Sequence, residues 1–459
     1  MKIPKILYKI AKDLETKGFK ALIVGGAVRD FILQKDVKDF DIEVYNIDSL
    51  NTLSSILSNY GSVNLVGKSF GVVKLKVDNV EYDFSIPRIE KKVAKGHKGF
   101  SIKVDGSLDF KEAAKRRDFT INAMAYDILE QKVLDVYGGL SDIRNKTLQI
   151  VDKNSFKEDP LRVYRAVQFA ARFEFNLSKD TFNSCLDLVQ SGALEELPKE
   201  RVWEEFKKLL LKAKKPSIGL ELMRNLGILK YFPELQAIIG VKQNSKYHLE
   251  GDVWTHTLMV VDEAAKLRVG DEEEDLILML SALCHDLGKA VTTKVIDGQI
   301  RALGHEVKGE QLTIDFLQRL TSKKDLIDEV AKLVRYHLMP MQLYKNGAKD
   351  GAIRRRSTKV NIKRLERLAR ADYFGRGGVE KKEFEAGDWL LNRAKALNCQ
   401  EEPPQSLIKG KDLINLGLEP SVKFKKILNK VYEAQLNGEI KSKEEAINLA
   451  KEIVFNNNL

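Results

Sequence analysis

The sequence is poor in cysteine and has no long apolar run. Its 459 residues include three cysteines, Cys185, Cys284 and Cys399, which lie far apart and never in CxxC spacing. This pattern argues against a disulfide framework and fits a reducing cytoplasm. No stretch approaches the roughly 18 apolar residues of a membrane-spanning helix, and residues 1–5 open no apolar signal-peptide core. We therefore expect a cytoplasmic protein without membrane partners.

Internal repeats and low-complexity segments are also missing, and the composition is ordinary for a globular protein. Hydrophobic residues make up 43% and charged residues 31% of the chain, which has room for about three domains. The formal net charge is +11. This excess favours a polyanionic partner, nucleic acid above all, although many basic proteins bind none.

Two kinds of secondary structure divide the chain. Short β-like runs at 21–24, 40–45, 72–77 and 81–85 alternate with helices in residues 1–150, and from Asp152 onward the pattern is helical. We expect an α+β head with a mixed sheet and helices, followed by an all-α remainder. The expected parts are 1–150, 151–238, 239–378 and a helical tail at 379–459, and the lysine-rich residues 91–108 are expected to form a loop.

The first candidate site combines a glycine turn with paired carboxylates. The apolar run 21–24 leads into Gly25-Gly26, and Asp39 and Asp41 follow two residues apart in a predicted strand. Residues i and i+2 of a strand share a face, so the two carboxylates would project together and hold Mg²⁺. Asp83 is the candidate third carboxylate. An isolated D-x-D is more often a solvated strand edge, so the pattern needs support from elsewhere.

That support comes from four ordered motifs that resemble the class II CCA-adding enzymes and bacterial poly(A) polymerases. The motifs are Gly25-Gly26-Ala27-Val28-Arg29-Asp30 with Asp39-Phe40-Asp41, Arg116-Arg117-Asp118 through Ala125, Glu158-Asp159-Pro160-Leu161-Arg162-Val163-Tyr164-Arg165, and Glu200-Arg201 through Glu204-Glu205. The resemblance covers about residues 15–235. It implies a nucleotidyltransferase head on 1–150 and a nucleotide-selecting, RNA-binding neck on 151–238.

The resemblance also implies roles for individual residues. Asp39, Asp41 and Asp83 would be catalytic, with Mg²⁺ on the first two. The implied nucleotide contacts are Gly26, Arg29, Arg117, Asp159, Arg162 and Arg165. Asp159 and Arg162 are expected on one helix face, where an acceptor and a donor can read the edge of C or A. Gln168 departs from the family, whose members often carry arginine there.

A second candidate site lies in residues 239–378, which hold five of the six histidines. His285-Asp286 ends an apolar helical run. Imidazole and carboxylate ligands suit a transition metal that activates water. The ordered H…HD…D pattern resembles the HD phosphohydrolase superfamily, and the resemblance implies His256, His285, Asp286 and Asp372 as ligands of a divalent metal such as Ni²⁺, Mn²⁺ or Co²⁺. His305 and His337 would support a second metal or bind phosphate. An HD domain with a mainly structural role is the alternative.

Together the two sites resemble the multifunctional CCA proteins. The expected function is template-independent addition of CCA to tRNA from CTP and ATP, with phosphatase or 2′,3′-cyclic phosphodiesterase activity in the HD domain. The alternatives are a poly(A) polymerase, a partial enzyme that adds only CC or A, a phosphohydrolase whose head only binds RNA, and a pure RNA-binding protein.

Overall fold

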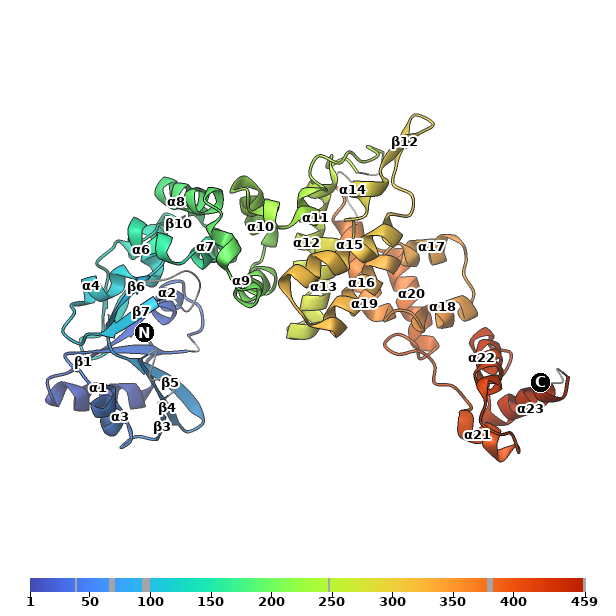
Figure 1. Cartoon of the computed structure of the whole chain (residues 1–459), viewed down its shortest axis with the longest axis horizontal. Coiled ribbons are helices and arrows are strands. Elements are labelled where there is room, and N and C mark those ends of the chain that lie inside the picture. The colour runs from blue at the N-terminus through green and yellow to red at the C-terminus, as the bar shows by residue number, and fades with distance from the viewer. Residues whose placement is uncertain (38, 66–70, 93–99, 247, 378–382, 457–459) are drawn as a thin grey trace. The chain divides into compact units, whose positions relative to one another are not determined.

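The computed structural model describes residues 1–37, 39–65, 71–92, 100–246, 248–377 and 383–456 (Figure 1). The chain divides into two compact units, Met1–Ile228 and Leu229–Leu459, which are described separately below as the first unit and the second unit. None of the helices in the described segments is both long and apolar enough to cross a bilayer.

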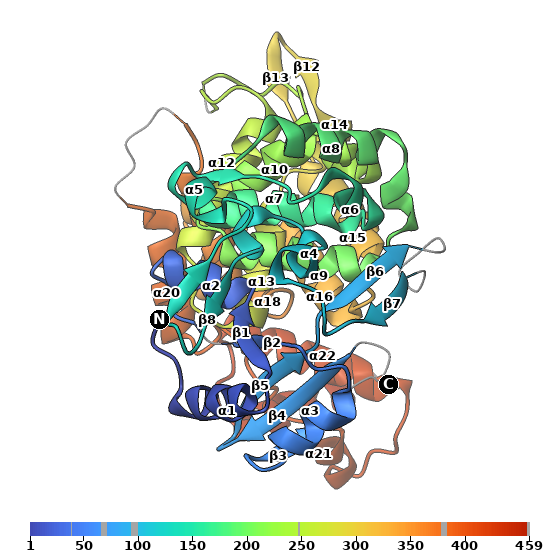
Figure 2. The ribbon, with the colours of Figure 1, turned by 90° about the vertical axis from the view of Figure 1, so that its left-hand side faces the viewer.

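A seven-stranded mixed sheet forms the centre of the first unit (Figure 2). In sheet order the strands are β3 (Ser62–Asn64), β4 (Val72–Val77), β5 (Val80–Ser85), β2 (Asp41–Tyr45), β1 (Lys20–Val24), β8 (Ala125–Asp127) and β9 (Lys132–Leu134). The pairing of β2 with β5 is parallel, and the other pairings in the sheet are antiparallel. Four consecutive residues of β1 and of β2 are buried, which explains why these strands read as apolar runs. The structure confirms the expected α+β head.

Helices cover the sheet and extend the first unit. They are α1 (Lys5–Thr16), α2 (Gly26–Ile32), α3 (Leu50–Leu57), α4 (Phe110–Lys115), α5 (Gly139–Arg144), α6 (Lys153–Glu158), α7 (Leu161–Phe173), α8 (Lys179–Gln190), α9 (Lys199–Lys212) and α10 (Pro216–Asn225). Helix α7 packs against α9 and α10. A Cβ on Gly219 of α10 would lie 2.5 Å from Leu209 Cδ1, so glycine permits this close packing.

The expected loop at 91–108 is partly wrong. Strands β6 (Arg88–Lys92) and β7 (Phe100–Val104) pair antiparallel and form a hairpin beside the main sheet (Figure 2). Lysines are uncommon in strands, and their charge hid the pairing from a propensity argument. Residues 93–99, with His97, fall outside the described segments.

In its described residues the second unit is helical, with one short β-hairpin. Its elements are α11 (Pro233–Gln236), α12 (Val253–Lys266), α13 (Glu272–Cys284), α14 (Lys289–Thr292), β12 (Lys294–Ile296), β13 (Gln299–Arg301), α15 (His305–Leu320), α16 (Lys324–Tyr336), α17 (Met339–Lys345), α18 (Asp350–Ser357), α19 (Ile362–Phe374), α20 (Glu385–Ala396), α21 (Gly410–Asn415), α22 (Val422–Asn437) and α23 (Lys443–Asn456). Helices α21 to α23 share a small apolar core.

Helix α13 is the central element of the second unit. Its last ten residues are all buried, and it contacts α12, α16 and α19. Asp271 caps its start by accepting a hydrogen bond from the backbone N–H of Glu274 at 2.9 Å. A helix buried on all sides is held firmly, so the residues that follow it, His285 and Asp286, are fixed in position.

Candidate functional sites

The carboxylates of the first unit gather at one end of the sheet. Strand β2 begins at Asp41, and its register places Asp41 directly opposite Asp83 of β5. Asp39 precedes the strand by two residues. Burial raises the pKa of Asp41, and the neighbouring carboxylates of Asp83 and Asp39 raise it further, against the opposing effect of Arg117. Like charges held close together are typical of a site that a divalent cation neutralises.

The glycine turn lies under an arginine of the second motif. Gly25 has φ of 72°, a conformation that other residues avoid, and a Cβ there would meet Arg117 Nη1 at 2.9 Å. Arg117 Nη1 also donates to the backbone oxygen of Asn122 at 3.3 Å. The turn therefore brings the first and second motifs together, as nucleotide binding by both would require.

Glu43 is a residue of this site that the sequence reasoning missed. It lies two residues after Asp41 in β2 and is 1% exposed. Its carboxylate lies 2.7 Å from Arg116 Nη2 and 3.6 Å from Arg117 Nη2, and accepts a hydrogen bond from the Tyr45 hydroxyl at 2.8 Å. Burial alone would raise the pKa of Glu43, but the two arginines outweigh it and lower the pKa. The alternation Asp39, Asp41, Glu43 on one strand face was the available signal.

A buried polar network joins three of the motifs. The Arg29 guanidinium donates to Asn122 Oδ1, and Asn122 Nδ2 donates to Asp118 Oδ1 at 3.0 Å. Arg165 Nε donates to Asp118 Oδ2 at 2.7 Å. Arg29 is 5% exposed, and burial lowers its pKa. The network fixes the glycine turn, the second motif and α7 relative to one another.

The three expected base-reading residues lie near one another but have separate partners. Asp159 Oδ2 is 3.1 Å from Arg201 Nη2, and Arg162 Nη1 donates to Ser155 Oγ at 3.2 Å. Asp159 is not on the face of a helix as expected: its backbone is extended and α7 begins two residues later. Proline at position 160 disfavours helical geometry at the preceding residue, which explains the difference. Gln168 is buried within α7.

In the second unit, five helices bring the six expected metal-site residues together. His256 lies on α12, His285 and Asp286 follow α13, His305 begins α15, His337 ends α16, and Asp372 lies on α19. These six residues form two groups of three, and within each group the ligand atoms all lie within 4.8 Å of one another. One is His256, His285 and Asp372, and the other is Asp286, His305 and His337. The three carboxylates of the first unit form no such compact group among the described residues.

Asp286 lies between the two histidine groups. Its Oδ2 is 3.1 Å from His285 Nε2 and 3.8 Å from His256 Nε2, while its Oδ1 is 3.3 Å from His305 Nε2 and 4.0 Å from His337 Nε2. Despite burial, the pKa of Asp286 is well below its usual value, chiefly because of His285 and Lys289. Burial and the neighbouring histidines lower the pKa of His337 to about 3. Carboxylate and imidazole groups at these distances form a donor set that suits a divalent metal.

Backbone carbonyls orient three of the imidazoles. Nδ1 of His285 lies 2.8 Å from the backbone oxygen of Ala282. The corresponding distance is 2.7 Å from His305 Nδ1 to the Ala302 oxygen, and 2.7 Å from His337 Nδ1 to the Val334 oxygen. A carbonyl oxygen accepts a hydrogen bond from Nδ1–H, which leaves the Nε2 lone pairs facing Asp286. His285 Nε2 is buried and makes no hydrogen bond in the described structure, while Asp286 Oδ2 has ion-pair contacts with Lys289 Nζ at 2.7 Å and His285 Nε2 at 3.1 Å. A buried ring nitrogen without a hydrogen bond fits a bound metal ion.

His248 and Glu250 belong to this site and were missed from the sequence. Glu250 Oε1 is 2.7 Å from His256 Nδ1 and 2.8 Å from His248 Nδ1. Burial would lower the pKa of His256, but hydrogen bonds to Asp372 and Glu250 raise it overall. A carboxylate behind a ligating histidine fixes its ring and increases its basicity. Both residues precede α12 in an irregular segment, where no periodicity marks them.

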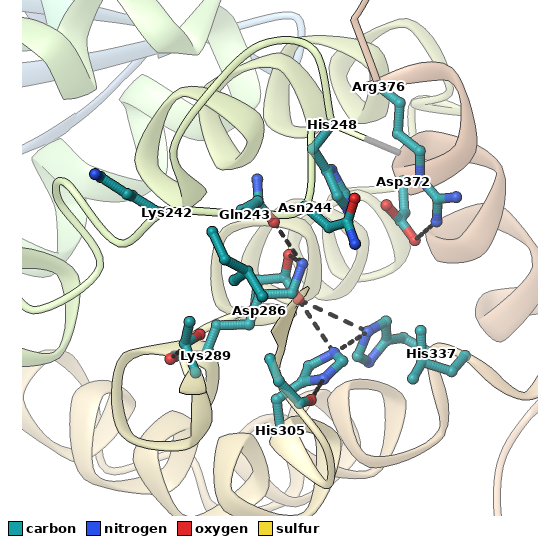
Figure 3. Close-up of a pocket in the computed structure, with 14 residues that line it drawn as sticks. Lys242, Gln243, Asn244, His248, Asp286, Lys289, His305, His337, Asp372 and Arg376 are labelled. Carbon is teal, nitrogen blue, oxygen red and sulfur yellow. Dashed lines mark hydrogen bonds and ion pairs between the residues drawn. The ribbon is translucent and has the colours of Figure 1, made fainter. Parts of the chain in front are cut away.

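A cavity of about 250 Å³ opens onto Asp286, His305, His337 and Asp372 (Figure 3). We call it the polar cavity, because Lys242, Gln243, Asn244 and Lys289 form much of the rest of its wall. Lys289 Nζ lies 2.7 Å from Asp286 Oδ2 and donates to Gln243 Oε1 at 2.7 Å. Cations and amides beside a metal-type cluster suit a phosphate group.

Comparisons with known proteins match the segments of the chain that carry both sites. Residues 21–149 match the poly A polymerase head domain, residues 174–239 the family described as "Probable RNA and SrmB- binding site of polymerase A", and residues 253–377 the HD domain. A multifunctional CCA protein of Neisseria meningitidis serogroup B is 36% identical over 69% of this chain and 72% of its own length. One from Xylella fastidiosa is 33% identical over 84% of this chain and 92% of its own.

Among solved structures, the Bacillus stearothermophilus CCA-adding enzyme in complex with CTP is similar in fold. It superposes with a TM-score of 0.67 over the whole of both chains at 21% identity. The motifs, the two sites and the extent of the sequence matches place this chain in the family of the multifunctional CCA proteins.

Proposed function

We propose that this protein adds CCA to the 3′ end of tRNA from CTP and ATP. The observation that carries the proposal is the register of Asp41 with Asp83 beside the glycine turn against which Arg117 lies. The names of the sequence relatives support it. We assign the head to residues 1–150, the nucleotide-selecting neck to 151–238, the HD domain to 239–378 and a tail to 379–459.

In the proposed reaction the tRNA 3′-hydroxyl oxygen attacks the α-phosphorus, and the bond to the pyrophosphate leaving group breaks. Asp39, Asp41 and Asp83 would hold two Mg²⁺ ions, which supply charge neutralisation and activation of the hydroxyl when bound. Gly26, Arg29 and Arg117 would contact the nucleotide. Arg117 neutralises the triphosphate, while Glu43 keeps its guanidinium in place.

Base selection is assigned to Asp159, Arg162 and Arg165. A carboxylate accepts from the exocyclic amine of C or A, and a guanidinium donates to a ring acceptor. Arg201 Nη2 lies 3.1 Å from Asp159 Oδ2, and Arg165 Nη2 lies 2.6 Å from Asp118 Oδ2. These ion pairs fix the positions of the selecting groups.

For the second unit we propose hydrolysis of phosphate monoesters and 2′,3′-cyclic phosphodiesters. His256, His285, Asp286 and Asp372 would hold a divalent transition metal, with His305 and His337 on the side of a second ion or of the phosphate. Such a metal supplies a hydroxide nucleophile near neutral pH when bound. The chain's own residues orient the reaction: Lys289 and Gln243 receive the phosphate oxygens, and Glu250 holds His256.

The test separates the two sites by one substitution in each. Asp41→Ala should abolish nucleotide incorporation into tRNA and leave hydrolysis of a 2′,3′-cyclic nucleotide intact. His285→Ala should do the reverse. If Asp41→Ala leaves nucleotide incorporation unchanged, Asp41 does not serve this reaction and the proposal fails. Hydrolysis that survives His285→Ala contradicts the HD assignment.

A further inference from the structure

A second cavity of about 240 Å³ adjoins the polar cavity. The two cavities share four wall residues, His337, Leu338, Asp372 and Arg376. His337, Asp372 and Arg376 lie on one side of the polar cavity (Figure 3). A molecule that occupies the second cavity therefore reaches the wall of the metal site.

The wall of this second cavity differs in chemistry from the polar cavity, and we call it the aromatic cavity. Met341, Tyr373 and Phe384 line it. The Tyr373 and Phe384 rings are stacked, with centroids 4.8 Å apart and planes inclined by 27°. Phe384 is buried, while Tyr373 and Met341 are only partly buried. Stacked aromatic rings in the wall of a cavity offer a surface on which another flat ring can pack.

Cationic side chains lie at the edge of the aromatic cavity. Lys345 is exposed, and Arg376 Nη2 is 3.0 Å from Asp372 Oδ2, at the boundary between the two cavities. Cations here suit the phosphate ester of a nucleotide, while the apolar wall between them does not suit a bare phosphate. The two cavities thus offer phosphate chemistry on one side and stacking on the other.

We propose that the aromatic cavity binds the nucleobase of the nucleotide whose phosphate is hydrolysed at the metal site. This inference rests on the proposed hydrolase function, and it assigns a binding surface to the base of the nucleotide substrate. The base packs on Tyr373 and against the Met341 thioether. The ribose then lies by Arg376, and the phosphate enters the polar cavity beside Lys289.

The test compares a nucleoside substrate with its base-free analogue. We expect the metal-loaded protein to have a KM for adenosine 2′,3′-cyclic phosphate about tenfold or more below that for 1-O-methylribose 2′,3′-cyclic phosphate. Tyr373→Ala should remove this difference by raising the KM for adenosine 2′,3′-cyclic phosphate without changing kcat. Met341→Ala should act in the same direction, and it leaves the Tyr373–Phe384 stack in place if Tyr373→Ala folds poorly.

The matched control is Tyr344→Ala. Tyr344 lies on α17, as Met341 does. Its ring packs edge-on against Trp389, but it does not line the aromatic cavity. Its substitution should leave both KM values unchanged. Equal KM values for the two substrates in the unmodified protein, or a preference that survives Tyr373→Ala and Met341→Ala, would overturn the inference and leave the hydrolase proposal standing.

A binding measurement separates failure of the inference from failure of the hydrolase proposal. Calorimetry with adenosine 2′-monophosphate and its base-free analogue is done with CTP present to occupy the head. If neither cyclic substrate is hydrolysed, the hydrolase proposal fails. Selective binding of the adenosine compound that is lost in Tyr373→Ala then still supports the base subsite, and binding without selectivity overturns it.

Discussion

The buried carboxylate of Glu43 gives the sharpest prediction for the first unit. Glu43→Gln keeps the shape of the side chain and removes its charge, so that Arg116 and Arg117 lose their shared counterion. Loss of one partner of a buried ion pair costs about 3–5 kcal/mol. The two arginines remain 22% and 17% exposed, and water relieves part of that cost. We expect a loss of about 2 kcal/mol in the stability of the first unit.

The same substitution should impair nucleotide binding. Arg117 lies against Gly25, and a guanidinium without its counterion loses its fixed orientation there. We expect the KM for CTP to rise about tenfold, which corresponds to about 1.4 kcal/mol. HD-domain hydrolysis, carried by the second unit, should be unaffected.

The assay needs to report on the first unit alone. Native-state hydrogen exchange of peptides from β2 and β5 does so, whereas whole-chain melting mixes the two units. Glu81→Gln on β5 is the matched control: Glu81 is 57% exposed and pairs only with Lys74 in the described structure, so its loss should cost less than about 0.5 kcal/mol. If Glu43→Gln has the same stability and the same KM for CTP as this control, Glu43 does not act as the counterion that holds Arg116 and Arg117.

The contribution of Glu43 to the stability of the first unit should depend on pH. The pKa of Glu43 is lower in the folded protein than its ordinary value of 4.5. Its contribution to stability is therefore complete above about pH 4.5 and is lost as the pH falls through the folded pKa. The difference between the unmodified protein and Glu43→Gln should shrink on acidification.

Three further results are expected. Glu250→Gln should weaken metal binding by the second unit about 10- to 100-fold in a calorimetric titration, because His256 loses the carboxylate that orients it; unchanged affinity would contradict this. Asp41→Asn should stabilise the metal-free first unit slightly at neutral pH and not at acid pH, because the pKa of Asp41 is raised and its ionised form is therefore disfavoured in the folded protein; a stability equal to that of the unmodified protein at both pH values would contradict this. The affinity for tRNA should fall about tenfold or more between 50 and 200 mM salt, and a flat response would exclude a phosphate-gripping basic surface.

Local patterns predicted the strands and the metal-type cluster well. Strands β1 and β4 lie within a residue of their expected bounds, because apolar runs between turns mark buried strands directly. The six expected residues of the HD site converge, since His285-Asp286 at the end of a buried helix leaves little freedom for their position.

Long-range pairing was beyond sequence reasoning. The contact of Glu43 with Arg116 spans 73 residues, and its signal, a third acidic residue in an alternating strand, also fits a solvated strand face. Glu250 lies in an irregular segment where no periodicity identifies a side chain that supports a ligand. The helix-face expectation for Asp159 gave too little weight to the proline after it.

The most direct test of the proposed function is the length of the product on tRNA that lacks its CCA end. With CTP and ATP both present, the unmodified protein should add three nucleotides and stop, and with CTP alone it should add two. A long A tail would identify a poly(A) polymerase, an arrest after CC or a requirement for preformed CC would identify a partial enzyme, and absence of incorporation would contradict the proposed chemistry altogether.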